Sequence, residues 1–177
     1  MLQNNNTPNF AAEINTMLTT MYKEKMVSHL KSHPYLFEPL LDLALKNEPW
    51  YSWRAAWLIW SCMDKNDSRI GEKITEIIDI IPNRPTNHQR ELLKVLQNMQ
   101  MDKAEIGHLT TICLGIWEDI SSQASARYNA IKLLVKISKS YPELMETLTI
   151  VVDEIYLESL SDGVKKSILH LMNKEKC

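Results

Sequence analysis

Hydrophobic positions along this chain recur at the three- and four-residue spacing of α-helices, and no segment keeps the strict alternation of a β-strand. Even the β-branched run TLTIVVDEIYL keeps this spacing, at Leu148, Val151, Val152 and Ile155. Six prolines fall between the apolar runs or at their starts, where a missing backbone amide costs little. The pattern predicts helices over residues 9–20, 22–32, 36–46, 50–64, 68–81, 86–99, 102–119, 123–140, 142–157 and 161–173.

Three segments have the residues of a helix N-terminus. Thr7-Pro8 fits an N-cap followed by proline at the first helical position, and Thr86 to Gln89 and Asp102 to Glu105 fit capping boxes. In a capping box the side chain of the fourth residue accepts a hydrogen bond from the backbone amide of the N-cap residue. Each segment therefore predicts a helix start.

The composition agrees with an all-α chain that forms one domain. Only 4 glycines occur in 177 residues, scattered too widely for the glycine-rich loops that hold phosphates, which argues against a nucleotide-binding α/β enzyme. A hydrophobic content of 45% suffices for one continuous core. We expect a single helical repeat domain over residues 1–177, with 1–8 as a loose N-terminal tail.

An internal repeat organises the helices into pairs. When the second helix of each pair is aligned on a basic residue, Arg54, Arg90, Arg127 and Lys165 follow one another at separations of 36, 37 and 38 residues. The positions three and six or seven residues later are apolar in every copy. This periodicity predicts an α-α superhelix of about five antiparallel helix pairs.

The aligned segments resemble HEAT repeats, whose second helix carries a pattern near V-R-x-A-A-x-x-A-L. Trp53-Arg54-Ala55-Ala56 and the segment from Arg127 to Ala130 match it best, and Arg54 to Trp57 is similar to a segment of short free-standing bacterial HEAT-like proteins. In many HEAT repeats an Asp six residues before the Arg forms a ladder between repeats. This chain has Glu48, Arg84, Ser121 and Ser159 there. The resemblance therefore implies stacked helix pairs without a regular ladder.

Four of the five tryptophans lie between residues 50 and 60. On a helix Trp50, Trp53, Trp57 and Trp60 fall within an arc of about 80°, as an aromatic binding surface or a core seam would require. Trp53, Trp57 and Trp60 align with mostly apolar residues in the other repeats, which favours the core. Trp50 and Tyr51 align with mainly polar or small residues, so these two are the candidate partner-binding aromatics.

Charge and cysteine content limit the possible partners and compartment. Lys and Arg total 20 against 22 Asp and Glu, so nucleic acid is not a favoured partner. Arg54, Arg90, Arg127 and Lys165 could bind acidic groups of a partner, or each could pair with a neighbouring helix terminus or carboxylate. Three widely spaced cysteines without CxxC spacing argue against disulfides and structural zinc. Without an apolar span or an evident export signal, a cytoplasmic protein without membrane contact is expected.

The sequence offers little catalytic or metal-binding chemistry. His29 and His33 are spaced for one helix face, but no HExxH motif or third ligand is identifiable, and His33 precedes Pro34, where the helix should end. We therefore expect no metal, no cofactor and no enzymatic activity. The favoured function is a non-catalytic protein-interaction or scaffold module with another protein as its partner. The alternative is a HEAT-like DNA-binding protein related to alkylpurine DNA glycosylases.

Overall fold

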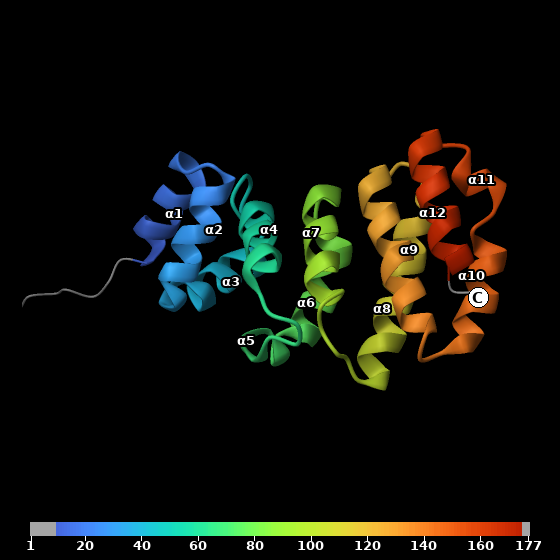
Figure 1. Ribbon diagram of the computed structural model, residues 1–177, viewed down its shortest axis with the longest axis horizontal. Helices are drawn as coiled ribbons and strands as arrows, with labels where there is room; N and C mark the ends of the chain where they lie inside the picture. The colour runs from blue at the N-terminus through green and yellow to red at the C-terminus, as the bar shows by residue number, and fades with distance from the viewer. Residues whose placement is uncertain (1–9, 175–177) are drawn as a thin grey trace, which may run out of the picture. The chain divides into compact units, whose positions relative to one another are not determined.

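The computed structural model describes residues 10–174 and shows helices throughout, with no β-strand in that range (Figure 1). The chain divides into two compact units, residues 1–63 and 64–177, hereafter unit 1 and unit 2. The all-α prediction is confirmed for the described residues. The single repeat domain stays a prediction, and the expected tail over 1–8 lies outside the described residues.

Unit 1 contains two successive helix pairs. Its elements are α1 (Phe10–Thr20), α2 (Lys23–Ser32), the 3-10 turn η1 (Pro34–Leu36), α3 (Phe37–Leu45) and α4 (Ser52–Cys62). Helix α3 packs on α4, which also contacts α2, and α1 packs on α3. Met17, Leu30, Leu40, Ala56 and Ile59 are among the buried side chains that these helices contribute to the core.

Unit 2 is built around one long buried helix. Its elements are α5 (Ser68–Gly71), α6 (Ile74–Ile80), η2 (Ile81–Asn83), α7 (Thr86–Leu96), α8 (Lys103–Glu118), α9 (Ala124–Ser138), α10 (Pro142–Val151), α11 (Glu154–Leu157) and α12 (Asp162–Lys174). Helix α9 contacts α7, α8, α10 and α12, and ten of its fifteen residues are buried. This central position makes α9 the main core helix of the unit.

The predicted helices are present, but two of them are interrupted. The helix expected over 68–81 divides into α5 and α6 at Gly71, a poor helix former. The helix expected over 142–157 ends at Val151, and a new turn starts where the Asp153 side chain accepts a hydrogen bond from the Glu154 amide. In both places local backbone preferences interrupt a continuous apolar pattern.

One of the three predicted helix starts is confirmed in full. The Asp102 carboxylate accepts from the Glu105 amide at 2.8 Å, and the Asp102 amide donates to the Glu105 carboxylate at 2.9 Å. The capping box predicted at Thr86 is wrong, because α7 already includes Thr86 and its N-cap is Pro85, which has no side-chain donor or acceptor. The start predicted at Thr7-Pro8 lies outside the described residues.

Candidate functional sites

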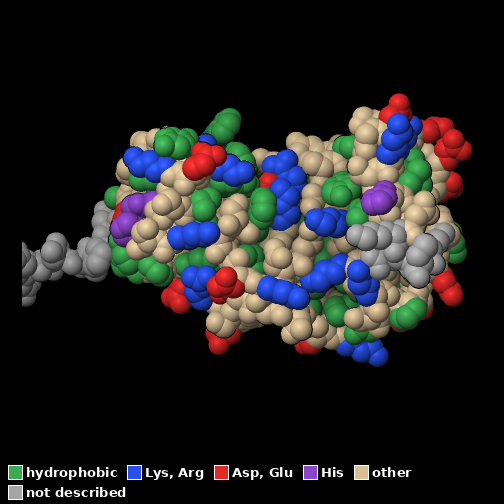
Figure 2. Space-filling view, viewed as in Figure 1, with side chains coloured by type: hydrophobic (Ala, Val, Ile, Leu, Met, Phe, Trp, Pro, Cys, Tyr) green, Lys and Arg blue, Asp and Glu red, His purple; other side chains and the backbone are tan. Residues whose placement is uncertain are grey.

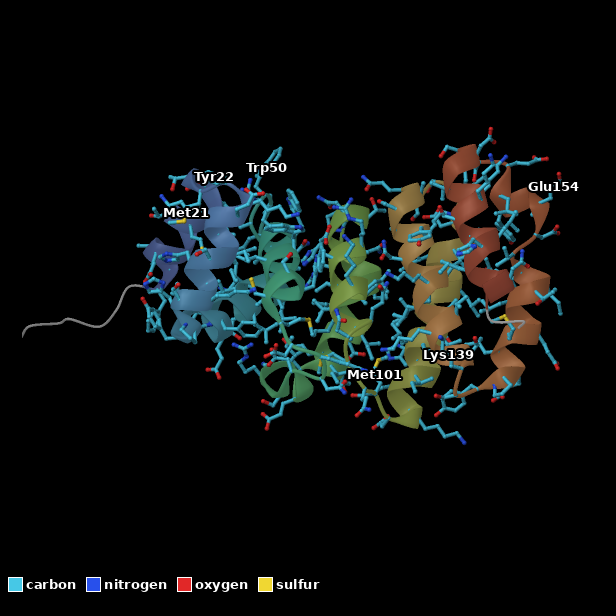
Figure 3. The ribbon with its side chains drawn as sticks, viewed as in Figure 1. Met21, Tyr22, Trp50, Met101, Lys139 and Glu154 are labelled. Carbon is cyan, nitrogen blue, oxygen red and sulfur yellow. The ribbon has the colours of Figure 1, made fainter. Side chains whose placement is uncertain are left out.

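Trp50 is the most exposed of the tryptophans in the described part of the chain and has a strained backbone. It lies in the loop between α3 and α4, 78% exposed, with φ at 72°. Bulky L-residues seldom adopt this left-handed conformation. The Tyr51 and Ser52 amides donate to the Glu48 carbonyl oxygen, and the Glu48 amide donates to the Ser52 hydroxyl at 3.0 Å. These bonds hold the loop so that the indole projects into solvent (Figure 3).

A second exposed aromatic residue lies at the N-terminal end of a neighbouring helix. Tyr22 is the N-cap of α2 and is 70% exposed, while Trp50 comes two residues before α4, which packs on α2. Figure 3 shows both residues at the edge of unit 1 where these two helices begin. The sequence interpretation overlooked Tyr22 as a surface residue because the repeat alignment placed it opposite Trp53.

Tyr51 has a different environment from Trp50. It is half-buried and lines a groove of about 550 Å³ between α1, α3 and the loop that carries Trp50. Apolar side chains, a loop carboxylate and a lysine line this groove together: Phe10, Ile14, Pro39, Leu43, Lys46 and Glu48. The two aromatic residues that the sequence predicted as partner-binding therefore lie on adjoining surfaces of unit 1. Trp50 projects into solvent, and Tyr51 lines the groove.

Trp53, Trp57 and Trp60 were predicted to be buried in the core, and they are less buried than predicted. All three are partly exposed, and the Lys23 ammonium lies 5.7 Å from the ring centroid of Trp57. The fully buried α4 positions are occupied by smaller residues, among them Ala55 and Ala56. Small side chains allow α4 to approach α3 closely, so the large indoles lie at the margin of this contact.

Arg127 is an internal structural residue. It is 1% exposed, and its guanidinium donates to the carbonyl oxygens of Trp117 and Tyr156 and to the hydroxyl of Ser159, at 2.7 to 2.8 Å. Burial lowers the pKa of Arg127, which the nearby Asp119 carboxylate partly opposes. This placement does not support the prediction that Arg127 contacts a partner.

One of the Arg127 contacts involves a residue at the aligned ladder position of the next repeat. Ser159 is the residue six positions before Lys165, where many HEAT repeats carry Asp. Arg90 contacts the Ser125 hydroxyl at 3.5 Å, but Ser125 lies four residues after the aligned position, Ser121. A neutral hydroxyl therefore stands in for the carboxylate at one aligned position, and a search for acidic residues does not detect it.

The other three aligned basic residues differ in the hydrogen bonds and ion pairs that their side chains form. Arg90 is bound by Glu91, a fully buried carboxylate that also binds Lys94 at 3.1 Å. Arg54 in unit 1 and Lys165 in unit 2 are half-buried, and neither side chain has a hydrogen bond or ion pair with a described residue. Arg54 and Lys165 are therefore more available to a partner than Arg90.

Acidic and basic residues of unit 2 are distributed unevenly between its helices. Helices α6, α8 and α10 carry six acidic residues and one Lys, whereas α7, α9 and α12 carry eight Lys or Arg and two acidic residues. Helix α9 contacts both α7 and α12, so the basic helices adjoin one another. Figure 2 shows Lys and Arg side chains gathered over α7 and α9. Net charges summed over each half of the sequence do not reveal this uneven distribution between helices.

A compact group of potential metal ligands lies between α1 and α2. Glu13, His29 and His33 each offer one ligand atom, all within 4.8 Å of one another, and all three residues are half-buried. The sequence interpretation identified no third ligand for the two histidines, and the structure brings Glu13 beside them as a candidate. Glu13 lies 16 residues before His29, and only the packing of α1 beside α2 brings them together.

Comparison with known families gives one match over nearly all of the chain, between residues 10–175 and the HEAT repeat domain. Searches of curated proteins and of solved structures gave no significant match. Together with the helices described above, the family match confirms the predicted HEAT-type all-α solenoid fold class. Within residues 10–174 no helix combines the length and apolar character needed to cross a lipid bilayer.

Proposed function

Because the chain belongs to the HEAT repeat domain family, whose repeats generally mediate protein interaction or scaffolding, we propose that it is a non-catalytic protein-interaction module. The proposed contact is the Trp50 surface of unit 1, defined as Trp50, Tyr51 and Arg54. The observation that carries this proposal is the exposure of the Trp50 indole on a left-handed backbone. No catalytic residue is part of the proposal.

Physical chemistry gives two reasons to regard Trp50 as a binding residue. A non-glycine residue in this conformation costs of order 1–3 kcal/mol, which a folded chain tolerates at positions with another role. Tryptophan is also enriched among the residues that dominate binding energy at protein interfaces, where its large apolar ring becomes buried. In the free chain most of this ring faces water.

The adjoining groove indicates the kind of partner. Phe10, Ile14 and Leu43 provide an apolar lining, and Lys46 and Glu48 pair across the loop at 3.5 Å. A peptide segment with apolar side chains would bury these groups and place its flank against the Trp50 indole. We therefore propose an apolar segment of another protein as the occupant, with Tyr51 and Arg54 as contacts at its edge.

Trp50→Gly is the sharpest test, because glycine removes the indole and readily adopts the same backbone conformation. Wild type and Trp50→Gly are immobilised, and proteins retained from cell lysate are identified by mass spectrometry. Each candidate is then purified and its Kd measured against both forms. We expect a partner whose affinity falls at least about tenfold in Trp50→Gly, as for a residue at the centre of an interface.

Ile150→Ala is the matched control, since Ile150 is another large hydrophobic side chain, 76% exposed, on α10 of unit 2. This variant should keep the wild-type affinity. If Trp50→Gly and Ile150→Ala both bind every partner as wild type does, Trp50 is not a contact residue. If the affinity falls equally in both variants, the Trp50 surface has no special role.

The adjoining basic helices of unit 2 favour one second candidate, binding to DNA. Several of their cations are already engaged, however: Arg127 is buried, Arg90 and Lys94 bind Glu91, and Lys136 donates to the carbonyl oxygens of Gln97 and Met99. Lys132, Lys165 and Lys166 remain to meet phosphates. A gel-shift assay at low salt with Lys165→Ala/Lys166→Ala tests this candidate, and unchanged mobility of the DNA with wild type would eliminate it.

We place the protein in the cytoplasm as part of the same proposal. Cys62 and Cys113 form no disulfide with a described residue, as expected in a reducing compartment. Cell fractionation with an antibody against the native chain tests this location. Recovery in a membrane or exported fraction would contradict it.

A further inference from the structure

We propose that Glu13, His29 and His33 form a binding site for a divalent transition-metal ion of the zinc class, which joins α1 to α2. The three ligand atoms lie within 4.8 Å of one another in unit 1. Two imidazoles and one carboxylate are a ligand set that zinc uses in proteins, with a further position left for water. The site is independent of the Trp50 surface.

The spacing of the ligand atoms suits such an ion. Ligands about 2.0–2.1 Å from a tetrahedral zinc ion lie about 3.3 Å from one another. His29 Nε2 and Glu13 Oε1 are 3.2 Å apart, so this pair already has the required separation. The His33 ligand atom lies within 4.8 Å of both other ligand atoms.

The two histidine rings are held side by side. His29 and His33 are stacked, with ring centroids 4.1 Å apart and an angle of 25° between the ring planes. His33 Nδ1 lies 2.8 Å from the carbonyl oxygen of His29 and can donate to it. That hydrogen bond leaves the lone pair on Nε2 free, which is the usual way a backbone carbonyl orients a metal-binding imidazole.

The surroundings of Glu13 resemble the outer shell of a metal site. The Tyr35 hydroxyl donates to Glu13 Oε1 at 3.2 Å, and a ligating carboxylate is commonly held by such a bond. The Tyr35 ring packs edge-on against His33 and lies 5.8 Å from the ring of Phe10. Aromatic side chains thus border the group, while its half-buried ligands stay accessible from solvent.

The test uses the full chain without a polyhistidine tag, in reducing buffer near neutral pH. Co²⁺ is titrated while its visible absorption is recorded, and Zn²⁺ binding is measured by calorimetry. We expect one ion per chain, an affinity that falls in acid because protons compete with the metal ion for its ligands, and a Zn²⁺-dependent rise in Tm.

Glu13→Gln, His29→Asn and His33→Asn should each weaken Zn²⁺ binding by at least about tenfold. His108→Asn is the matched control, because His108 also lies near a carboxylate, at 3.4 Å from Asp79, but in unit 2. His108→Asn and Cys62→Ser should bind as wild type does. Circular dichroism confirms that each variant is folded.

Two results would overturn the proposal. One is a wild-type chain that gives no Co²⁺ spectrum and no Zn²⁺ heat. The other is wild-type affinity in folded Glu13→Gln and His33→Asn, which would place the ion elsewhere. In either case the three residues serve only as a hydrogen-bonded contact between α1 and α2.

Discussion

The guanidinium of Arg127 lies over the indole ring of Trp117, 4.6 Å from the ring centroid, and its Nε donates to the carbonyl oxygen of the same residue. Trp117 in turn donates from its indole nitrogen to the carbonyl oxygen of Val151 at 2.8 Å. Both side chains are fully buried. Through these two residues α8 and α9 are tied to the end of α10 and to the turn before α12.

Arg127→Met should destabilise unit 2 by about 2–4 kcal/mol. The substitution keeps most of the apolar stem but leaves the carbonyl oxygen of Trp117 without its Arg127 donor, and the carbonyl oxygen of Tyr156 keeps only its longer bond from the Ser159 hydroxyl. Urea unfolding followed by circular dichroism measures the change. Lys132→Met, an exposed position on the same helix, should stay within about 0.5 kcal/mol of wild type. Equal stability of the two variants would contradict the structural role of Arg127.

Asp67→Asn should weaken unit 2 at neutral pH by about 1–2 kcal/mol, because asparagine has one acceptor oxygen where Asp67 has two, and it cannot accept both hydrogen bonds from the Arg69 side chain. Hydrogen bonds from the Arg69 side chain hold the pKa of Asp67 below its ordinary value, against the opposing effect of burial. A carboxylate with a lowered pKa in the folded state stabilises the fold above its unfolded pKa, and this stabilisation is lost as the pH falls through its folded value.

The difference between wild type and Asp67→Asn should therefore be present at neutral pH and shrink below about pH 4. Thermal unfolding across this pH range measures it. Glu118→Gln, at an exposed carboxylate of the same unit, serves as the control and should show little difference at any pH. If the stability difference between wild type and Asp67→Asn grew larger in acid, the lowered pKa of Asp67 would be refuted.

Cys113 should resist alkylation in the folded chain. Burial raises the pKa of its thiol, so little reactive thiolate forms at neutral pH. Cys62 is half-buried at the end of α4 and should be modified by iodoacetamide first. Peptide mass spectrometry before and after denaturation distinguishes the two sites. Labelling of Cys113 as fast as Cys62 without denaturant would show that the α8 core opens readily.

Trp50→Gly should leave unit 1 at least as stable as wild type and raise its stability by up to about 1 kcal/mol. The glycine relieves the backbone strain at φ 72°, although it also adds freedom to the unfolded chain. Trp50→Ala removes the same indole but keeps the strain, so it should be the less stable variant. Chemical unfolding of both measures the difference, and equal stabilities would mean that the left-handed backbone carries no strain.

Much of the fold could be predicted from the sequence because helix periodicity and proline positions are local signals. The capping box at Asp102 and Glu105 is an example, since four consecutive residues determine it. The sequence pattern did not predict helix interruptions that depend on a single residue, such as the division between α5 and α6 at Gly71. The burial of Trp53, Trp57 and Trp60 was misjudged because apolar character does not reveal how closely two helices approach.

The candidate sites were less accessible to sequence reasoning because they depend on contacts between distant residues. Glu13 joins the two histidines only through the packing of α1 and α2. The sequence left two roles open for Arg127, and only its acceptors, two backbone carbonyls and one serine, distinguish between them. Backbone acceptors are present at every residue, so no sequence motif marks them.

The uneven distribution of charge between the helices of unit 2 gives this unit an electric dipole. Such a dipole can orient an approaching partner before any contact forms, and its reach is set by the Debye length, about 8 Å at physiological ionic strength. The basic helices α7, α9 and α12 would turn toward an acidic region, and α6, α8 and α10 would turn away from it. Salt would then change how fast unit 2 meets a charged partner more than how tightly the pair holds.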